Sequence, residues 1–121
     1  PENAWGNLGQ AYLEQERWDE AIDALSRSVA AQPAFCVGFY RLGLAWEGKK
    51  ELAKALESYS RALETEAAPC QRMQLAYLAR ARVQLQIGAV DAAREDIDQC
   101  LALDANGRTG KDCATLRERL K

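Results

Sequence analysis

The sequence predicts an all-α protein built from repeated pairs of antiparallel helices. Two observations predict this class: the chain matches itself after a shift of 34 residues, and the apolar residues of each copy recur at helical spacing. The matched positions keep residue class and size; they pair Trp5 with Phe39, Leu8 with Leu42, Gly9 with Gly43, Tyr12 with Trp46, Ala21 with Ala55 and Leu25 with Tyr59. Each copy therefore forms one structural repeat, in which Gly9 and Ala21, like Gly43 and Ala55, let the two helices approach closely. The bulky Trp5, Tyr12 and Trp18 are expected to fill the space between repeats.

Each copy supplies two helices, whose ranges follow from the apolar spacing. We expect first helices near 2–16, 35–49 and 70–87, and second helices near 18–32, 52–66 and 90–103. Pro33 and Pro69 fall at the joins between copies. The repeats are expected at about 2–35, 36–69 and 70–107 within a single domain that spans residues 1–121.

The third copy follows the second after 38 residues, so four residues are inserted before it. Four residues make about one helical turn, and Pro69 suits the first turn of a helix. The segment PCQRMQLAYLARARVQLQIG is therefore expected to be one helix lengthened at its start, and a bulged loop is the alternative. In the third copy, polar residues occupy positions that are expected to be apolar; they are Arg80, Gln84 and Arg94. The first helix of this copy is therefore expected to be rotated or partly solvated, with Val83 and Leu85 buried instead.

Residues 109–120, TGKDCATLRERL, place Cys113, Leu116 and Leu120 on one helical face. This pattern is typical of a terminal capping helix, which covers the last exposed core edge of a repeat protein. The charged face is interpreted as solvated. A basic binding patch is the alternative, made by Arg117, Arg119 and Lys121.

Composition argues against several classes of function. No apolar stretch approaches the roughly 20 residues of a membrane span, and a net charge of −2 gives no broad attraction to nucleic acid. The chain contains no histidine, which removes histidine metal sites and histidine-activated nucleophiles. The adjacent acidic pairs Asp19–Glu20 and Glu95–Asp96 are interpreted as solvated. We expect no enzyme, no cofactor and no metal, in a piece of a longer protein that begins here at Pro1.

The chain resembles the tetratricopeptide-repeat family. The resemblance rests on WGNLGQAY at residues 5–12 and its variant FYRLGLAW at 39–46, on the alanine that opens each second helix, and on Pro33 at the end of the first unit. It covers roughly residues 2–105. The family implies a right-handed superhelix of three helix pairs and a capping helix, whose first helices line a concave groove.

The resemblance implies a non-catalytic scaffold that binds a mostly apolar peptide or helix of a partner protein in this groove. The corresponding positions are Asn3, Gly6, Gln10, Leu13, Val37, Tyr40, Leu44, Glu47, Leu75, Leu78, Arg82 and Leu85. We expect Tyr40 to anchor the partner; shielding of these side chains by neighbouring first helices is the alternative. Co-chaperones of the family clamp acidic tails with basic and amide side chains, whereas the clamp positions here hold Gly6, Gln10, Leu44, Leu75 and Ala79, which argues against a chaperone-tail adaptor.

Two alternative functions follow from the same residues. One is an assembly module whose groove is filled by its own chain or by a second copy, so that the protein self-associates. The other is an exported assembly factor, similar to the tetratricopeptide lipoproteins that help pilus secretins assemble. Paired cysteines favour the latter.

The four cysteines, Cys36, Cys70, Cys100 and Cys113, lack the close spacing of a zinc site or a redox CxxC pair. Cys100 occupies a small core slot, and Cys113 lies on the inner face of the predicted cap. A disulfide between them would fix the cap and imply an oxidising compartment such as a periplasm, and a bond between Cys36 and Cys70 is the other conceivable pair. Free buried thiols, expected in a cytoplasmic protein, are the alternative.

Overall fold

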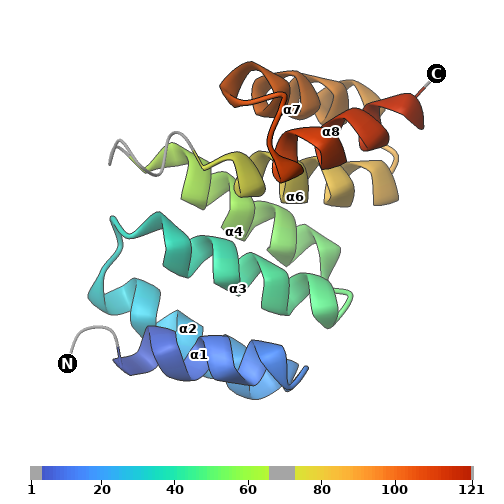
Figure 1. Cartoon of the computed structure of the whole chain (residues 1–121). Coiled ribbons are helices and arrows are strands. Elements are labelled where there is room, and N and C mark those ends of the chain that lie inside the picture. The colour runs from blue at the N-terminus through green and yellow to red at the C-terminus, as the bar shows by residue number, and fades with distance from the viewer. Residues whose placement is uncertain (1–3, 66–72, 121) are drawn as a thin grey trace. The chain divides into compact units, whose positions relative to one another are not determined.

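The computed structural model describes residues 4–65 and 73–120, and its regular elements there are all helices (Figure 1). They are α1 (Ala4–Glu14), α2 (Trp18–Ala31), α3 (Cys36–Gly48), α4 (Leu52–Glu64), α6 (Gln74–Gln86), α7 (Val90–Leu103) and α8 (Arg108–Glu118). The predicted all-α class is confirmed. The chain divides into two compact units, Pro1–Gln71 and Arg72–Lys121, so α1 to α4 belong to the first and α6 to α8 to the second. The single-domain organisation and the repeat bounds stay predictions.

The same tight turn joins the two helices of each pair. One residue in each turn has a left-handed backbone: the φ angles are 58° at Glu16, 69° at Lys50 and 86° at Gly88. The following amide donates a hydrogen bond back across the last helical turn, from Arg17 to the Tyr12 carbonyl at 2.9 Å, from Glu51 to Trp46 at 2.9 Å and from Ala89 to Gln84 at 2.8 Å. This bond is typical of a Schellman helix end. The sequence repeat is therefore also a backbone repeat.

Glycines bring the two helices of each pair in the first unit close together. A Cβ atom at Gly9 would lie 2.5 Å from the side chain of Leu25, and one at Gly43 would overlap the ring of Tyr59. Leu25 and Tyr59 are fully buried. The prediction that small residues set the helix separation is confirmed at these two positions. Trp5, which was expected to fill the space between repeats, is instead 38% exposed.

The α2–α3 interface joins the two helix pairs of the first unit. Leu42 of α3 belongs to the same buried cluster as Leu25 of α2, and Val29 of α2 lies against Gly38. At the other end of the interface the indole ring of Trp18 packs against Gly48. Two further pairs contribute to this interface: Ala21 shares the cluster with Ala45, and Lys49 forms a 2.7 Å ion pair with Asp19.

Cations lie over aromatic rings at repeated positions of the first unit. The Arg27 guanidinium lies 4.8 Å from the Trp5 ring centroid, and Arg61, 34 residues further on, lies 5.0 Å from that of Phe39. The Lys54 ammonium lies 4.5 Å from the Trp46 ring centroid. These contacts shield ring faces that the helix pairs do not cover among themselves.

The core of the second unit contains an ion pair where the second repeat has apolar and small residues. Arg80 binds Asp96 through two hydrogen bonds of 2.7 Å, and the Asp96 side chain is only 6% exposed. The predicted solvation of Asp96 is therefore wrong, because the fork of donors on Arg80 satisfies the buried carboxylate. Partial solvation is also wrong for Gln84, which is 8% exposed, while Val83 is buried as predicted. Arg94 remains exposed, beside Asp91.

Helix α6 begins later than predicted. Met73 has φ and ψ angles of −75° and 86°, outside the helical range, so one continuous helix from Pro69 is wrong; residues 66–72 lie outside the described residues. The side chain of Gln74 donates hydrogen bonds to the carbonyls of Cys100 at 2.8 Å and Asp104 at 2.6 Å. These bonds attach the start of α6 to the end of α7 and satisfy carbonyl groups that a helix end leaves open.

Candidate partner-binding site

The groove residues predicted in the first unit lie on α1 and α3. Val37, Tyr40, Leu44 and Glu47 follow one another along α3, and each is half-buried. On α1, Gln10 donates a hydrogen bond to Glu14 at 3.2 Å, and Leu13 packs against the core. Asn3 lies outside the described residues. Partner binding by these residues stays a prediction.

Tyr59 of α4 supports two of the predicted groove residues on α3. Its hydroxyl donates a 2.7 Å hydrogen bond to Oε1 of Glu47, and its ring centroid lies 6.0 Å from that of Tyr40. Sequence reasoning aligned Tyr59 with Leu25 and treated it as core alone. The available signal was its hydroxyl, because a fully buried tyrosine usually needs a hydrogen-bond partner.

In the second unit, two adjoining open clefts are lined by residues of α6, of α8 and of the two positions that follow α8. The larger, which we call the α6–α8 cleft, has a volume of about 460 Å³ and is lined by Arg82, Leu85, Gln86, Leu116, Arg119 and Leu120. The smaller, of about 220 Å³, is lined by Leu78, Arg82, Asp112, Thr115, Leu116 and Arg119. Three of the four α6 residues predicted for the groove therefore open into clefts shared with α8, while the fourth, Leu75, is exposed.

The contribution of α8 to these clefts was missed by sequence reasoning. Leu116 and Leu120 were assigned to the core face of a cap, and Arg119 to a solvated face. Leu116 is 8% exposed and belongs to the core, but it also lines both clefts together with Arg119. Arg82 and Arg119 line both clefts, and Asp112 lines the smaller one.

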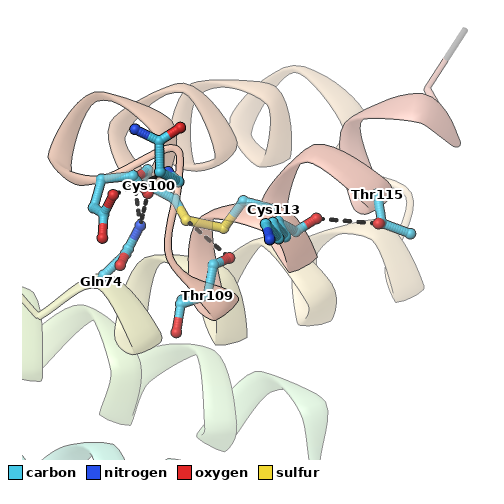
Figure 2. The surroundings of a disulfide bond; sticks show 8 residues. Gln74, Cys100, Thr109, Cys113 and Thr115 are labelled. Atoms are coloured by element: carbon cyan, nitrogen blue, oxygen red, sulfur yellow. Dashed lines mark hydrogen bonds between the residues drawn. A yellow bond between two sulfur atoms is a disulfide. The ribbon is translucent and has the colours of Figure 1, made fainter.

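A buried disulfide attaches α8 to α7 (Figure 2). It joins Cys100 and Cys113, whose Cα atoms are 6.5 Å apart and whose side chains are fully buried. Near the start of α8, Gly110 packs on the preceding backbone, where a Cβ atom would lie 2.7 Å from the carbonyl carbon of Ala105. Cys36 is also disulfide-bonded, and Cys70, its conceivable partner, lies outside the described residues.

Two surface ion pairs of the first unit change the pKa of one of their members. A hydrogen bond from the Arg17 guanidinium lowers the pKa of Glu20 below its ordinary value. A hydrogen bond to Asp19 raises the pKa of Lys49. Neither pair lines the α6–α8 cleft.

Residues 4–65 and 73–120, the described parts of the chain, hold no group of three or more cysteine, aspartate or glutamate side chains arranged to bind a metal ion. None of their helices combines the length and the apolar character needed to cross a lipid bilayer.

Comparison with known sequences identifies the repeated unit. The tetratricopeptide-repeat family matches residues 2–35 and, separately, residues 75–106, which together make up more than half of the chain. The chain is a tetratricopeptide-repeat protein. The family predicted from WGNLGQAY and FYRLGLAW is thereby confirmed.

Solved structures of tetratricopeptide domains share the fold at low sequence identity. The TPR2B domain of yeast Sti1, in a complex with pHsp70, has a TM-score of 0.90 and 19% identity over 98% of this tetratricopeptide-repeat protein and 94% of that chain. The first TPR domain of Spaghetti (RPAP3), bound to the HSP90 peptide SRMEEVD, has a TM-score of 0.85 and 21% identity over 98% and 92% of the two chains. These likenesses confirm the tetratricopeptide fold.

A curated relative is much longer than this tetratricopeptide-repeat protein. Anaphase-promoting complex subunit 3 of Schizosaccharomyces pombe is 30% identical over 101 residues, which are 84% of this chain. The match spans 15% of the length of that relative.

Proposed function

We propose that this tetratricopeptide-repeat protein is a non-catalytic scaffold whose α6–α8 cleft docks a segment of a partner protein. The observation that carries the proposal is the lining of the cleft, where Leu85, Leu116 and Leu120 accompany Arg82 and Arg119. Apolar surface gathered in a concave site is typical of protein docking. The disulfide joins α8, one wall of the cleft, to α7, and Gly110 packs the start of α8 on the preceding backbone. Both contacts support the proposal because they fix the position of this wall.

The chemistry of the lining defines the proposed ligand. Leucine side chains favour an apolar side chain of the partner, and the Arg119 guanidinium can bind a carboxylate through two parallel hydrogen bonds. The ligand is therefore a mostly apolar peptide or helix with one acidic group near Arg119. This keeps the apolar ligand predicted from the sequence and adds one charge to it.

The chaperone ligands of the two structural neighbours are poor candidates for this chain. The HSP90 peptide SRMEEVD of the Spaghetti complex carries three acidic side chains. No cationic side chain occupies the five positions at which the family resemblance places a basic clamp: Gly6, Gln10, Leu44, Leu75 and Ala79. Gly6 is buried against Ser28, and Ala79 is 1% exposed. Binding of chaperone tails is therefore not part of the proposed function.

Selection of phage-displayed random peptides on the immobilised chain tests the proposal. We expect enriched peptides to contain leucine or aromatic residues near one carboxylate. Synthetic copies should bind Leu120→Glu at least tenfold more weakly than wild type, measured by isothermal titration calorimetry. The peptide SRMEEVD serves as a comparator and should show no saturable binding.

Leu103→Glu is the matched control for this test. Leu103 is 41% exposed at the end of α7 and lines neither cleft, so its replacement should change peptide affinity less than twofold. Equal loss of affinity in both variants, or none in either, contradicts the proposal. Tyr40→Ala/Leu44→Glu tests the α3 surface separately, and loss of binding there alone would move the site to the first unit.

The disulfide favours one alternative, an exported assembly factor. Stable disulfides occur mainly in oxidising compartments, and the cysteines at 36, 100 and 113 are all bonded. Acid quenching of source cells, followed by alkylation of free thiols, tests this alternative by mass spectrometry. Alkylated Cys100 and Cys113 would contradict it.

A further inference from the structure

Helix α8, one wall of the α6–α8 cleft, buries few of its own side chains. Its buried residues are Gly110, Cys113 and Leu116, and of these only Leu116 is large and apolar. Most other residues of α8 are exposed. Because hydrophobic stabilisation scales with the apolar area removed from water, burial of side chains alone holds α8 weakly against the second unit.

The sequence of α8 also gives it little helix stability of its own. Its 11 residues include Thr109, Gly110 and Thr115, and its N-cap residue, Gly107, makes no side-chain cap hydrogen bond. Glycine and threonine have low helix propensities, and isolated helices shorter than about 12–15 residues are marginally stable in water. Helix α8 therefore depends on its attachment to the rest of the second unit.

The Cys100–Cys113 disulfide supplies this attachment (Figure 2). It joins the middle of α8 to α7, and both cysteines are fully buried. Cys113 and Leu116 are three residues apart on α8, so they lie on the same face of the helix. Leu116 lines both clefts. The disulfide thus holds in place the part of α8 that forms the cleft wall.

The loop before α8 is held by other bonds. Oδ1 of Asp104 accepts hydrogen bonds from the backbone amides of Asn106 at 2.9 Å and Gly107 at 3.2 Å. The side chain of Gln74 donates a hydrogen bond to the Asp104 carbonyl at 2.6 Å. These bonds keep the start of α8 near α7 when the disulfide is absent, and the short tether keeps the two thiols at a high effective concentration.

We infer that the α6–α8 cleft is assembled by oxidation: it is complete when Cys100 and Cys113 are joined, and it opens when they are thiols. The loop at residues 104–107 is the hinge about which α8 leaves the second unit. This regulation rests on the proposed function, because control of the cleft has an effect only if the cleft binds the partner peptide.

Oxidation requires a disulfide-bonded acceptor such as glutathione disulfide. A thiolate of one cysteine attacks the acceptor and releases one glutathione; the thiolate of the other cysteine then displaces the second glutathione as the Sγ–Sγ bond forms. The cysteines give up two electrons and two protons, and the acceptor leaves as two glutathione thiols. The open form exposes the thiols to the acceptor, whereas the closed form buries the bond away from reductants.

Hydrogen exchange of the full chain, measured by mass spectrometry before and after treatment with dithiothreitol, tests the inference without any ligand. We expect the amides of α8 to exchange at least tenfold faster after reduction, while those of α6 and α7 change less than twofold. Unchanged slow exchange of α8 in the reduced chain overturns the inference. Equal loss of protection in all three helices also overturns it, because the second unit would then unfold as a whole.

The variant Cys100→Ala/Cys113→Ala controls for reduction of the other disulfide, that of Cys36. Alanine fits the position of Cys100 because Ala62, the corresponding residue of the second repeat, is fully buried. Helix α8 of this variant should exchange fast without reductant, and dithiothreitol should change its exchange no further. Protection of α8 equal to that of the oxidised wild type overturns the inference.

Failure of this inference can be told apart from failure of the proposed function. Phage-selected peptides should bind the reduced chain at least tenfold more weakly than the oxidised chain. If α8 opens on reduction but the peptides bind both forms equally, the opening is supported and the cleft is not the peptide site. If α8 stays closed while the peptides bind, the inference is overturned and the proposed function stands without it.

Discussion

The hydroxyl of Tyr59 donates a 2.7 Å hydrogen bond to the carboxylate of Glu47, across the second helix pair. We expect Tyr59→Phe to lower the free energy of unfolding by about 1.5–3 kcal/mol, since the acceptor is charged and the ring packing is retained. Urea titration followed by circular dichroism measures the change. Glu47→Gln keeps an acceptor at this position and should cost less; an equal cost would show that the charge, not the bond, stabilises the pair.

Gly110 is expected to tolerate no side chain. A Cβ atom there would lie 2.7 Å from backbone carbon of Ala105, and backbone cannot rotate away as a flexible side chain can. Gly110→Ala should therefore lower stability by about 1–3 kcal/mol.

Gly88 gives the contrast, because a Cβ atom at this position meets nothing within 4 Å and only its φ of 86° disfavours a side chain. Gly88→Ala should cost about 1 kcal/mol, and Gly88→Asn less, since asparagine adopts left-handed backbone more readily. At Gly110 asparagine should be no better than alanine. Thermal denaturation of the four variants separates the two causes, and rescue by asparagine at Gly110 would refute the contact explanation.

Replacing both Arg80 and Asp96 should cost less stability than replacing Arg80 alone. Arg80→Leu alone leaves a buried carboxylate without its partner and should cost about 3 kcal/mol. The double variant Arg80→Leu/Asp96→Ser introduces the residues that the second repeat has at these positions, Leu42 and Ser58. It should unfold within about 1 kcal/mol of wild type. Equal destabilisation by the single and double variants in urea would contradict this account.

The Cys100–Cys113 disulfide is expected to stabilise the second unit. The cysteines are 13 residues apart. Closing a loop of this size restricts the unfolded chain and so stabilises the folded state by about 2–4 kcal/mol. Cys100→Ala/Cys113→Ala should lower the free energy of unfolding by this amount under oxidising conditions, as measured by urea titration. The disulfide of Cys36 remains intact in this variant and so does not contribute to the difference.

The pKa of Glu20 should depend on Arg17. The guanidinium donates a 2.8 Å hydrogen bond to the carboxylate and lowers its pKa below the ordinary value. A lowered pKa means that the pair stabilises the fold above the unfolded-state pKa and that this contribution is lost as pH falls through the folded-state pKa. The chemical shift of the Glu20 carboxyl carbon against pH measures the titration. Arg17→Ala should return the midpoint to the ordinary range, and an unchanged midpoint would exclude Arg17 as the cause.

Sequence periodicity predicted most helix bounds because the apolar spacing and the 34-residue repeat can both be seen in the sequence without knowing which helices pack together. The helix expected near 18–32 is Trp18–Ala31, and the one expected near 90–103 is Val90–Leu103. The start of α6 could not be predicted in the same way, since it depends on bonds from Gln74 to carbonyls 26 and 30 residues away.

The candidate site was predicted only in part, for the same reason. Residues on α6 could be placed by family register, but the opposite wall of the cleft depends on how α8 packs, which Leu116 and Arg119 do not reveal by spacing alone. The burial of Asp96 was missed because an acidic residue is solvated by default, and its partner Arg80 is on another helix. Tertiary pairing, rather than helix formation, was the information that the sequence pattern lacked.

All three tryptophans of the chain, Trp5, Trp18 and Trp46, lie in the first compact unit, and each has a different neighbour: an arginine, a glycine and a lysine. The tryptophan fluorescence of the protein therefore comes from the first unit. A peptide bound in the α6–α8 cleft has no tryptophan in the cleft lining to report it. Tryptophan emission should thus follow the unfolding of the first unit, whereas circular dichroism follows the helices of both units.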